Sequence, residues 1–279
     1  MGLKPTNTAQ FFVNNTLNNL ELFKGSFTTY QFKPHFHETY TIIFLDYGVG
    51  DYSYNDAKHI IETGTLLIFN PYDVHTGRSV EGQPWHFRSM YIPIPVMKKV
   101  MSRLNLTETL PVFQNNIVQD KVVFQKGQKA FPKLIYEQNQ QASEALLLDF
   151  LIDLVDGYAH IGVLPEPVSK GFATAKGIRE YIHAHYVEDV SIGHLSQLVG
   201  LPEYSLVKTF KYYFQLPPHQ YLLNLRIEKA KSLLAEKYSS TEVAYRSGFF
   251  DQSHFIRHFK RIIGITPKQF SAKITPDLI

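Results

Sequence analysis

An internal repeat in the last third of the chain is the feature that most restricts its fold. Residues 195–200 match residues 243–248 at an offset of 48, and the segments after these match at an offset of 49. Each copy predicts a short helix, a turn at Gly200 or Gly248, a second helix, and a third helix that begins at Pro218 or Pro267. Helix, glycine turn and helix is the helix-turn-helix layout. Two copies in tandem therefore predict an all-helical domain with two such modules.

The charge of the chain is unevenly divided, and the repeat lies in its basic part. Residues 1–169 carry 13 Lys and Arg against 16 Asp and Glu, a net charge of −3, whereas residues 170–279 carry 15 against 9, a net charge of +6. Nucleic acid is the leading candidate partner for the basic part, because Lys and Arg that bind its phosphates release counterions, and this release favours binding. On charge alone, a solvated basic face without a partner is an alternative.

Short alternating or aromatic runs fill the chain from about residue 20 to residue 93. Clusters of Gly, Asn, Asp and Pro separate them, for example at residues 46–48, 62–64 and 70–73. Strands spaced this regularly predict an antiparallel barrel or sandwich. After residue 93 the hydrophobic period changes, which predicts helices over residues 96–104, 120–138 and 143–160.

The third of these helices carries a wide apolar stripe that includes Leu147, Phe150, Leu151 and Leu154. This stripe is wider than packing against one partner face requires. It therefore indicates packing on the chain's own barrel and also on a second subunit. Packing within the chain alone is the alternative. We expect a homodimer.

The prolines at positions 165 and 167 cannot continue a helix, so a linker is expected there. The expected domains are residues 1–163, with a barrel at about 20–93 and helices at about 94–160, a linker at 164–171, and residues 172–279. The predicted fold class is α+β: an N-terminal antiparallel β-barrel with flanking helices and a C-terminal all-α domain with two helix-turn-helix modules.

The chain contains no Cys, which excludes disulfides, a thiolate zinc site and a cysteine nucleophile. It also suits a reducing compartment. The first residues lack the apolar region of a signal peptide, and no run reaches the roughly 18 apolar residues of a membrane span. We therefore expect a cytoplasmic protein with no membrane partner.

Several motifs of the basic domain fit one known pattern. They are IREYI at 178–182, LSQLVGL at 195–201, AYRSGF at 244–249, SHFIRHFK at 253–260 and GITP at 264–267. About 100 residues thus resemble the C-terminal domain of the AraC/XylS family of bacterial transcription regulators. The N-terminal half resembles, through weaker motifs, the cupin-like sensing domain of that family.

The resemblance implies two helices, at roughly 203–214 and 251–262, that enter successive major-groove segments of double-stranded DNA at an operator or promoter. A helix over residues 218–236 would join the two modules. Asp251 is expected to cap the second helix, Arg257 to read guanine and Gln252 to read adenine. The expected DNA-binding residues are Tyr204, Ser205, Val207, Lys208 and Lys211 on the first helix, and Gln252, Ser253, His254, Arg257, Lys260 and Arg261 on the second.

The first module departs from the family pattern at three positions. Pro202 stands where a Ser commonly caps the first reading helix, Val207 offers no hydrogen bond, and Gln215 replaces a Gly after that helix. A left-handed turn at Gln215 costs more than it would at Gly. We expect the first module to read bases less sharply than the second.

The N-terminal half carries what looks like both parts of a cupin motif, with His35 and His37 in the first part and His75 in the second. His35 and His37 alternate along a strand and so face the same side of a sheet. In metal-binding cupins such histidines and a later Glu hold a divalent ion. Here Glu38 directly follows His37, and the later position near Thr41 has no carboxylate. A sensing pocket without a metal is therefore expected; a metal site and purely structural histidines are the alternatives.

An apolar cavity with a few placed polar groups is the usual small-ligand site. The expected effector-binding residues are His35, His37, Tyr40, His75, Trp85 and Arg88, with Tyr72 also near the barrel mouth. If Arg88 points inward, it favours a carboxylate or phosphate ligand. A surface salt bridge is the other interpretation of Arg88.

These features together predict a DNA-binding transcription regulator, not an enzyme, that responds to a small-molecule effector and needs no cofactor. RNA polymerase is a further expected partner. One rival hypothesis is a metal-dependent cupin enzyme fused to a DNA-binding domain. Another is a constitutive DNA-binding protein whose barrel only dimerises.

Overall fold

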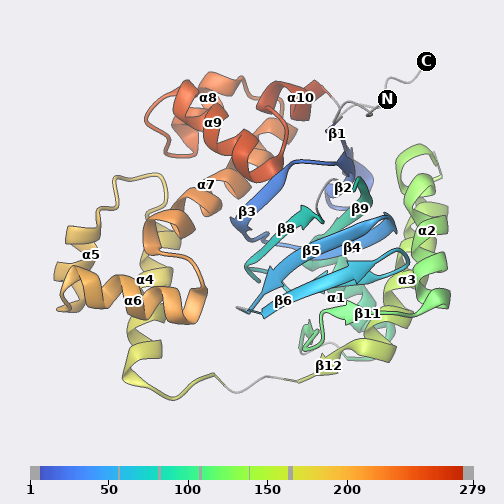
Figure 1. The fold of residues 1–279 in the computed structure, drawn as a ribbon, viewed down its shortest axis with the longest axis horizontal. Coiled ribbons are helices and arrows are strands. Elements are labelled where there is room, and N and C mark those ends of the chain that lie inside the picture. The colour runs from blue at the N-terminus through green and yellow to red at the C-terminus, as the bar shows by residue number, and fades with distance from the viewer. Residues whose placement is uncertain are drawn as a thin grey trace.

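The structure is a computed structural model that describes residues 7–55, 57–80, 83–106, 109–137, 139–162 and 166–272. An antiparallel β domain with three flanking helices forms its first half, and helices alone form its second half (Figure 1). The predicted α+β fold class is therefore confirmed. Among the described helices, none has the length and hydropathy to cross a membrane.

Two antiparallel sheets face each other in the β domain. The larger has the strand order β1-β2-β9-β4-β7-β11, the smaller the order β3-β8-β5-β6, and β10 pairs with β12. The strands are β1 (Thr8–Asn14), β2 (Leu20–Phe27), β3 (Gln31–His35), β4 (Tyr40–Tyr47), β5 (Val49–Tyr54), β6 (Ala57–Glu62), β7 (Leu66–Phe69), β8 (His75–Ser79), β9 (Trp85–Ile92), β10 (Pro111–Val112), β11 (Ile117–Val118) and β12 (His160–Ile161). A short 3-10 helix, Asn15–Leu17, joins β1 to β2.

Three helices cover the outer face of the larger sheet: α1 (Ile94–Arg103), α2 (Lys121–Tyr136) and α3 (Gln140–Tyr158). The apolar stripe of α3 packs with β2, β4, β7 and β9 in one continuous core. Leu147, Phe150, Leu151 and Leu154 are each at most 1% exposed. The expectation that this stripe also contacts a second subunit is wrong, because the chain's own sheet and helices already cover it.

The second half contains α4 (Lys170–Ala184), α5 (Ile192–Val199), α6 (Glu203–Phe214), α7 (Pro218–Ala235), α8 (Ser240–Arg246), α9 (Gln252–Ile263) and α10 (Pro267–Ala272). The pairs α5/α6 and α8/α9 are the two predicted helix-turn-helix modules, and α7 connects them (Figure 1). Asp251 caps α9 through a bond from the His254 N–H (2.6 Å), as predicted. Of the expected linker, Leu164 and Pro165 lie outside the described residues.

Both modules pack on the β domain. Phe36, which follows β3, contacts Tyr221 of α7 with ring centroids 4.7 Å apart, within a core shared with α4–α6. Phe11 of β1 contacts Phe270 of α10 at 4.3 Å, within a core that joins the inside of the β domain to α7–α10. Because apolar side chains from both halves share these cores, the orientation of α7 and α9 depends on the β domain.

Candidate functional site

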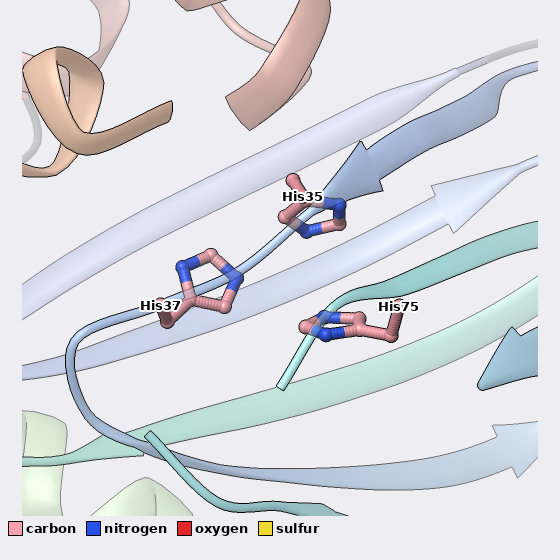
Figure 2. A group of neighbouring side chains, drawn as sticks. All are labelled: His35, His37 and His75. Carbon is pink, nitrogen blue, oxygen red and sulfur yellow. The ribbon is translucent and has the colours of Figure 1, made fainter. Parts of the chain in front are cut away.

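Three histidines from neighbouring segments meet inside the β domain. His35 ends β3, and the strand register places it opposite His75, the first residue of β8. The ring of His37 joins them, but β3 ends at His35, so the prediction that His35 and His37 alternate along one strand is wrong. Ring centroids are 4.4 Å apart for His35 and His75, 4.9 Å for His35 and His37, and 5.5 Å for His37 and His75. Figure 2 shows the three rings gathered between the ends of the strands.

The turn at residues 70–73 connects the segments that carry these rings. Asn70 donates from its backbone N–H and from Nδ2 to Asp73 Oδ2, at 2.8 and 2.9 Å, which closes the turn. The Tyr72 N–H donates to the His37 carbonyl oxygen at 2.8 Å. The turn therefore ties the chain at His37 to the chain just before His75.

Hydrogen bonds at Nδ1 orient all three rings. His35 and His75 contact the backbone carbonyl oxygens two positions before them, at 2.8 and 3.0 Å. His37 contacts Glu228 Oε1 of α7 at 3.0 Å. Carbonyl and carboxylate oxygens only accept, so each Nδ1 carries the hydrogen and each Nε2 keeps a lone pair.

Burial favours the neutral form of all three imidazoles. Burial, with help from His37, lowers the pKa of His35 to about 3. Burial likewise lowers the pKa of His75, where His35 and His37 add to the effect. It also lowers the pKa of His37, against the opposing pull of Glu228. Removing these rings from water disfavours their charged forms.

A cavity of about 50 Å³ lies beside these histidines, between the two sheets. Its walls are mainly aromatic, with Phe69, Trp85 and Tyr91 among them. Thr41 Oγ1 and Trp85 Nε1 belong to this wall, are buried, and have no hydrogen-bond partner among the described residues. Buried polar atoms without partners are uncommon and indicate where a polar ligand would gain hydrogen bonds.

The helical half of the chain closes one side of the cavity. Lys231 of α7 and Ile262 and Ile263 of α9 complete its lining. Tyr30 fixes α9 to the β domain, because its hydroxyl donates to the carbonyl oxygens of Lys260 (2.8 Å) and Arg261 (3.1 Å) at the end of that helix. Any change in the cavity that moves this wall also moves α7 or α9.

A buried charge cluster lies where α7 meets the β domain. Lys231 Nζ is 2.6 Å from Glu21 Oε2 of β2 and 3.3 Å from Glu228 Oε1. Burial by itself lowers the pKa of Lys231, but the two carboxylates raise it above its usual value. Nearby, Lys229 pairs with Glu38 at 2.8 Å. These pairs fix α7 against the barrel.

Two expected effector-binding residues lie outside the cavity. Arg88 is on the outer face of the larger sheet, where it pairs with Asp46 at 2.6 Å and lies over the ring of Phe131 of α2. Tyr40 is buried in the α1–α3 core and donates to the Pro111 carbonyl oxygen at 2.8 Å. Trp85 and the three histidines line the cavity, as expected for pocket residues.

Helix α9 exposes the predicted face. Phe255 and Phe259 are buried. The expected DNA-binding residues of α9 are exposed, except for a half-buried His254: Gln252, Ser253, Arg257, Lys260 and Arg261. Among the described residues, the side chains of Arg257 and Lys260 have no ion pair or hydrogen bond, so their charges are free to meet phosphates or bases.

Helix α6 presents the matching face, with Tyr204, Lys208 and Lys211 exposed, Ser205 and Val207 half-buried, and Leu206 and Phe210 buried. Pro202 gives it no side-chain cap. Gln215 adopts the left-handed conformation with φ of 59°, where Gly264 has φ of 88° after α9. The first module thus lacks both the cap and the glycine that the second module has, as the sequence departures predicted.

Sequence reasoning missed the residues from the other half of the chain that line the cavity, Lys231, Ile262 and Ile263, and also Glu228, which contacts the His37 ring. Glu228, Lys231, Ile262 and Ile263 lie roughly 190 residues or more from His37. Glu228 and Lys231 look like ordinary surface charges of a helix. The sequence signal that could have found them is the distribution of apolar residues in α7. These residues occur on every side of the helix over residues 221–234, which indicates that the helix is enclosed.

Comparison with known proteins identifies the family. Residues 18–155 match the family model of an AraC-like ligand binding domain, and residues 195–273 match that of a helix-turn-helix domain. The chain belongs to the AraC family of transcription regulators. It combines an N-terminal ligand-binding domain with a C-terminal DNA-binding domain.

Relatives of this AraC-type chain align over most of its length. An uncharacterized HTH-type transcriptional regulator of Bacillus subtilis, YbfI, is 29% identical over 80% of this chain and 81% of its own. The HTH-type transcriptional activator RhaS of an Enterobacter species is 24% identical over 85% of this chain and 87% of its own. ToxT from Vibrio cholerae, bound to an unsaturated fatty acid, has the same fold, with 14% identity, a TM-score of 0.58 and 98% coverage of both chains.

Proposed function

We propose that this AraC-type regulator reads DNA with α6 and α9 and senses a small-molecule effector in the cavity beside His35, His37 and His75. The single observation that carries the proposal is the composition of the cavity wall. It combines residues of the β domain with Lys231, Ile262 and Ile263 of the DNA-binding half. An effector in the cavity therefore contacts α7, which connects the two helix-turn-helix modules, and α9, which is proposed to read DNA. Such contacts are what coupling between the effector site and the DNA site requires.

The size of the cavity limits the effector. Pockets for drug-sized ligands measure about 300–1,000 Å³, whereas this one measures about 50 Å³. A very small effector fits as the cavity stands. A longer one, such as a fatty acid like that in ToxT, requires the cavity to widen, and a displacement of Ile262 and Ile263 would also move α9.

The expected DNA contacts can be tested by footprinting on the promoter beside the protein's own gene. If Arg257 reads a base edge, Arg257→Ala weakens specific binding by about 1–3 kcal/mol and relaxes sequence preference. Lys260→Ala should weaken binding to all sequences and reduce the salt dependence. Lys98→Ala on α1 removes an exposed charge far from these helices and serves as the control. Normal operator binding by Arg257→Ala would show that α9 is misassigned.

Trp85 provides a direct test of the effector site, because it is the only Trp in the chain and lines the cavity. A metabolite that binds there changes Trp85 fluorescence and shifts the melting temperature. Either His37→Ala or His75→Ala should abolish the response of DNA binding to that metabolite while DNA binding itself persists. A normal response in both variants places the effector elsewhere.

The protein is also proposed to act as a homodimer in the cytoplasm, with one subunit on each of two half-sites. RNA polymerase is a proposed partner because RhaS relatives are named activators. We favour a sensor over an enzyme because relatives aligned over four fifths of the chain are named transcription regulators. Sedimentation at micromolar concentration tests the dimer, and a monomer at that concentration rules it out.

A further inference from the structure

The three histidines form a more specific arrangement than an effector pocket requires. One ring nitrogen from each of His35, His37 and His75 lies within 4.8 Å of the other two. All three side chains are buried. The Nδ1 atoms are used by the Lys33 and Asp73 carbonyl oxygens and by Glu228. The Nε2 atoms have no hydrogen-bond partner among the described residues, so three lone pairs remain available.

This pattern matches the way proteins prepare histidines for metals. A histidine that binds a metal through one nitrogen almost always donates the other N–H to a carbonyl or carboxylate, which fixes the tautomer and the ring orientation. Each of the three rings here has that bond.

The space beside the rings suits an ion with one or more exchangeable ligands. A Zn²⁺ ion with nitrogen ligands at about 2.0–2.1 Å holds those nitrogens roughly 3.4 Å apart, so nitrogens that lie within 4.8 Å of one another need to approach by at most about 1.4 Å. The cavity of about 50 Å³ adds room for one or two water-sized ligands. Thr41 Oγ1 and Trp85 Nε1, both without partners among the described residues, belong to its wall and can hydrogen-bond such a ligand.

We propose that His35, His37 and His75 bind one divalent transition-metal ion through their Nε2 atoms, with its open coordination positions turned into the cavity. Three imidazoles favour ions such as Zn²⁺, Co²⁺, Ni²⁺ or Fe²⁺ over Mg²⁺ and Ca²⁺, which prefer oxygen ligands. The sequence argued against a metal because no carboxylate follows at the expected spacing. The structure assembles three converging ligands without it.

The site is linked to the DNA-binding half through Glu228. This carboxylate comes from α7, accepts the His37 Nδ1–H and also contacts Lys231 (3.3 Å). A bound cation strengthens that hydrogen bond, because it makes the His37 N–H a better donor. By reciprocity, docking of α7 strengthens metal binding. Glu228 is thus a positioning residue for the metal and a contact between the two halves of the chain.

Equilibrium dialysis of the full-length chain against Co²⁺ and Zn²⁺, after treatment with a chelator, tests the proposal. We expect one ion per chain and a visible Co²⁺ spectrum typical of nitrogen ligation. His75→Gln should abolish tight binding, and Glu228→Gln should weaken it about 10–100-fold, as changes in such supporting residues do. His86→Ala, at an exposed histidine on the outside of the same domain, is the matched control and should bind normally.

Far-UV circular dichroism and the melting temperature report whether each variant is folded. If His75→Gln is unfolded, His35→Gln replaces it as the ligand variant. The proposal is wrong if the wild-type protein binds no ion. It is also wrong if folded His75→Gln or His35→Gln binds as tightly as His86→Ala, because the ions then lie elsewhere. These readouts use the metal alone, so they do not depend on the effector or on the proposed DNA contacts.

Discussion

Replacing Lys231 by Met tests whether the buried charge cluster holds the two halves of the protein together. Lys231 is 3% exposed, and its Nζ neutralises Glu21 and Glu228 at the junction of α7 and β2. Met has a similar length and keeps the contact with the aromatic wall of Tyr91. The substitution therefore removes the charge and leaves most of the packing.

The magnitude follows from what the substitution leaves behind. Removing one partner of a buried ion pair costs about 3–5 kcal/mol, because the remaining charge is buried without compensation. Burial and the neighbouring Glu228 raise the pKa of Glu21 even in the presence of Lys231. Without Lys231 that pKa rises further, so Glu21 takes up a proton more readily in the folded state than in the unfolded chain. The stability deficit of the variant should therefore grow as pH rises above the pKa of an unfolded Glu.

Urea unfolding at pH 5 and pH 8, followed by Trp85 fluorescence for the β domain and by circular dichroism for the helices, measures this deficit. We expect Lys231→Met to be less stable by about 3–5 kcal/mol at pH 8 and by less at pH 5. The double variant Glu21→Gln/Lys231→Met should recover part of the loss, because it removes one of the stranded carboxylates. If Lys231→Met stays within about 1 kcal/mol of wild type at both pH values, the cluster does not stabilise this interface.

Three further predictions concern the fold. Leu151→Asp should unfold the β domain and not merely separate subunits, because even Leu→Ala at a buried site costs about 2–5 kcal/mol; a folded monomer in size-exclusion chromatography would contradict the packing of α3. Gly200→Ala should lower the free energy of unfolding by about 1–2 kcal/mol, because Gly200 has a left-handed backbone conformation. Gly248→Ala should lower it further in the same unfolding assay, because the added Cβ would lie 2.8 Å from backbone atoms of Tyr186 and Val187, whereas a Cβ at Gly200 meets no atom within 4 Å. Equal losses in the two variants would refute this. Burial and Arg261 lower the pKa of His258 to about 4, so the stability that His258 contributes should fall as pH drops from 6.5 towards 4. Between pH 7 and pH 5, the free energy of unfolding of His258→Gln should fall by up to about 1 kcal/mol less than that of the wild type. Parallel pH profiles of the two proteins would exclude this.

Local patterns in the sequence were enough to predict the DNA-binding half. The two helix-turn-helix modules follow from the repeat, from glycines that adopt left-handed conformations at Gly200 and Gly248, and from the Asp251 cap. The bond geometry of a helix fixes which side chains share a face, so the exposed and buried sides of α6 and α9 could be assigned from spacing alone. Strand alternation predicted that His35 and His37 share one side, but β3 ends at His35, and contacts outside the strand place the His37 ring beside the other two.

Only the tertiary structure decided where the remaining side chains point and what they contact. Strand β9 has buried residues on both faces, so alternation could not tell whether Arg88 enters the cavity or, as observed, contacts Asp46 outside it. Nothing in the pattern of α7 separated Glu228 and Lys231 from solvent-exposed charges. Their burial results from contacts with strands about 200 residues earlier in the chain, and such long-range packing leaves no periodic signal in the sequence.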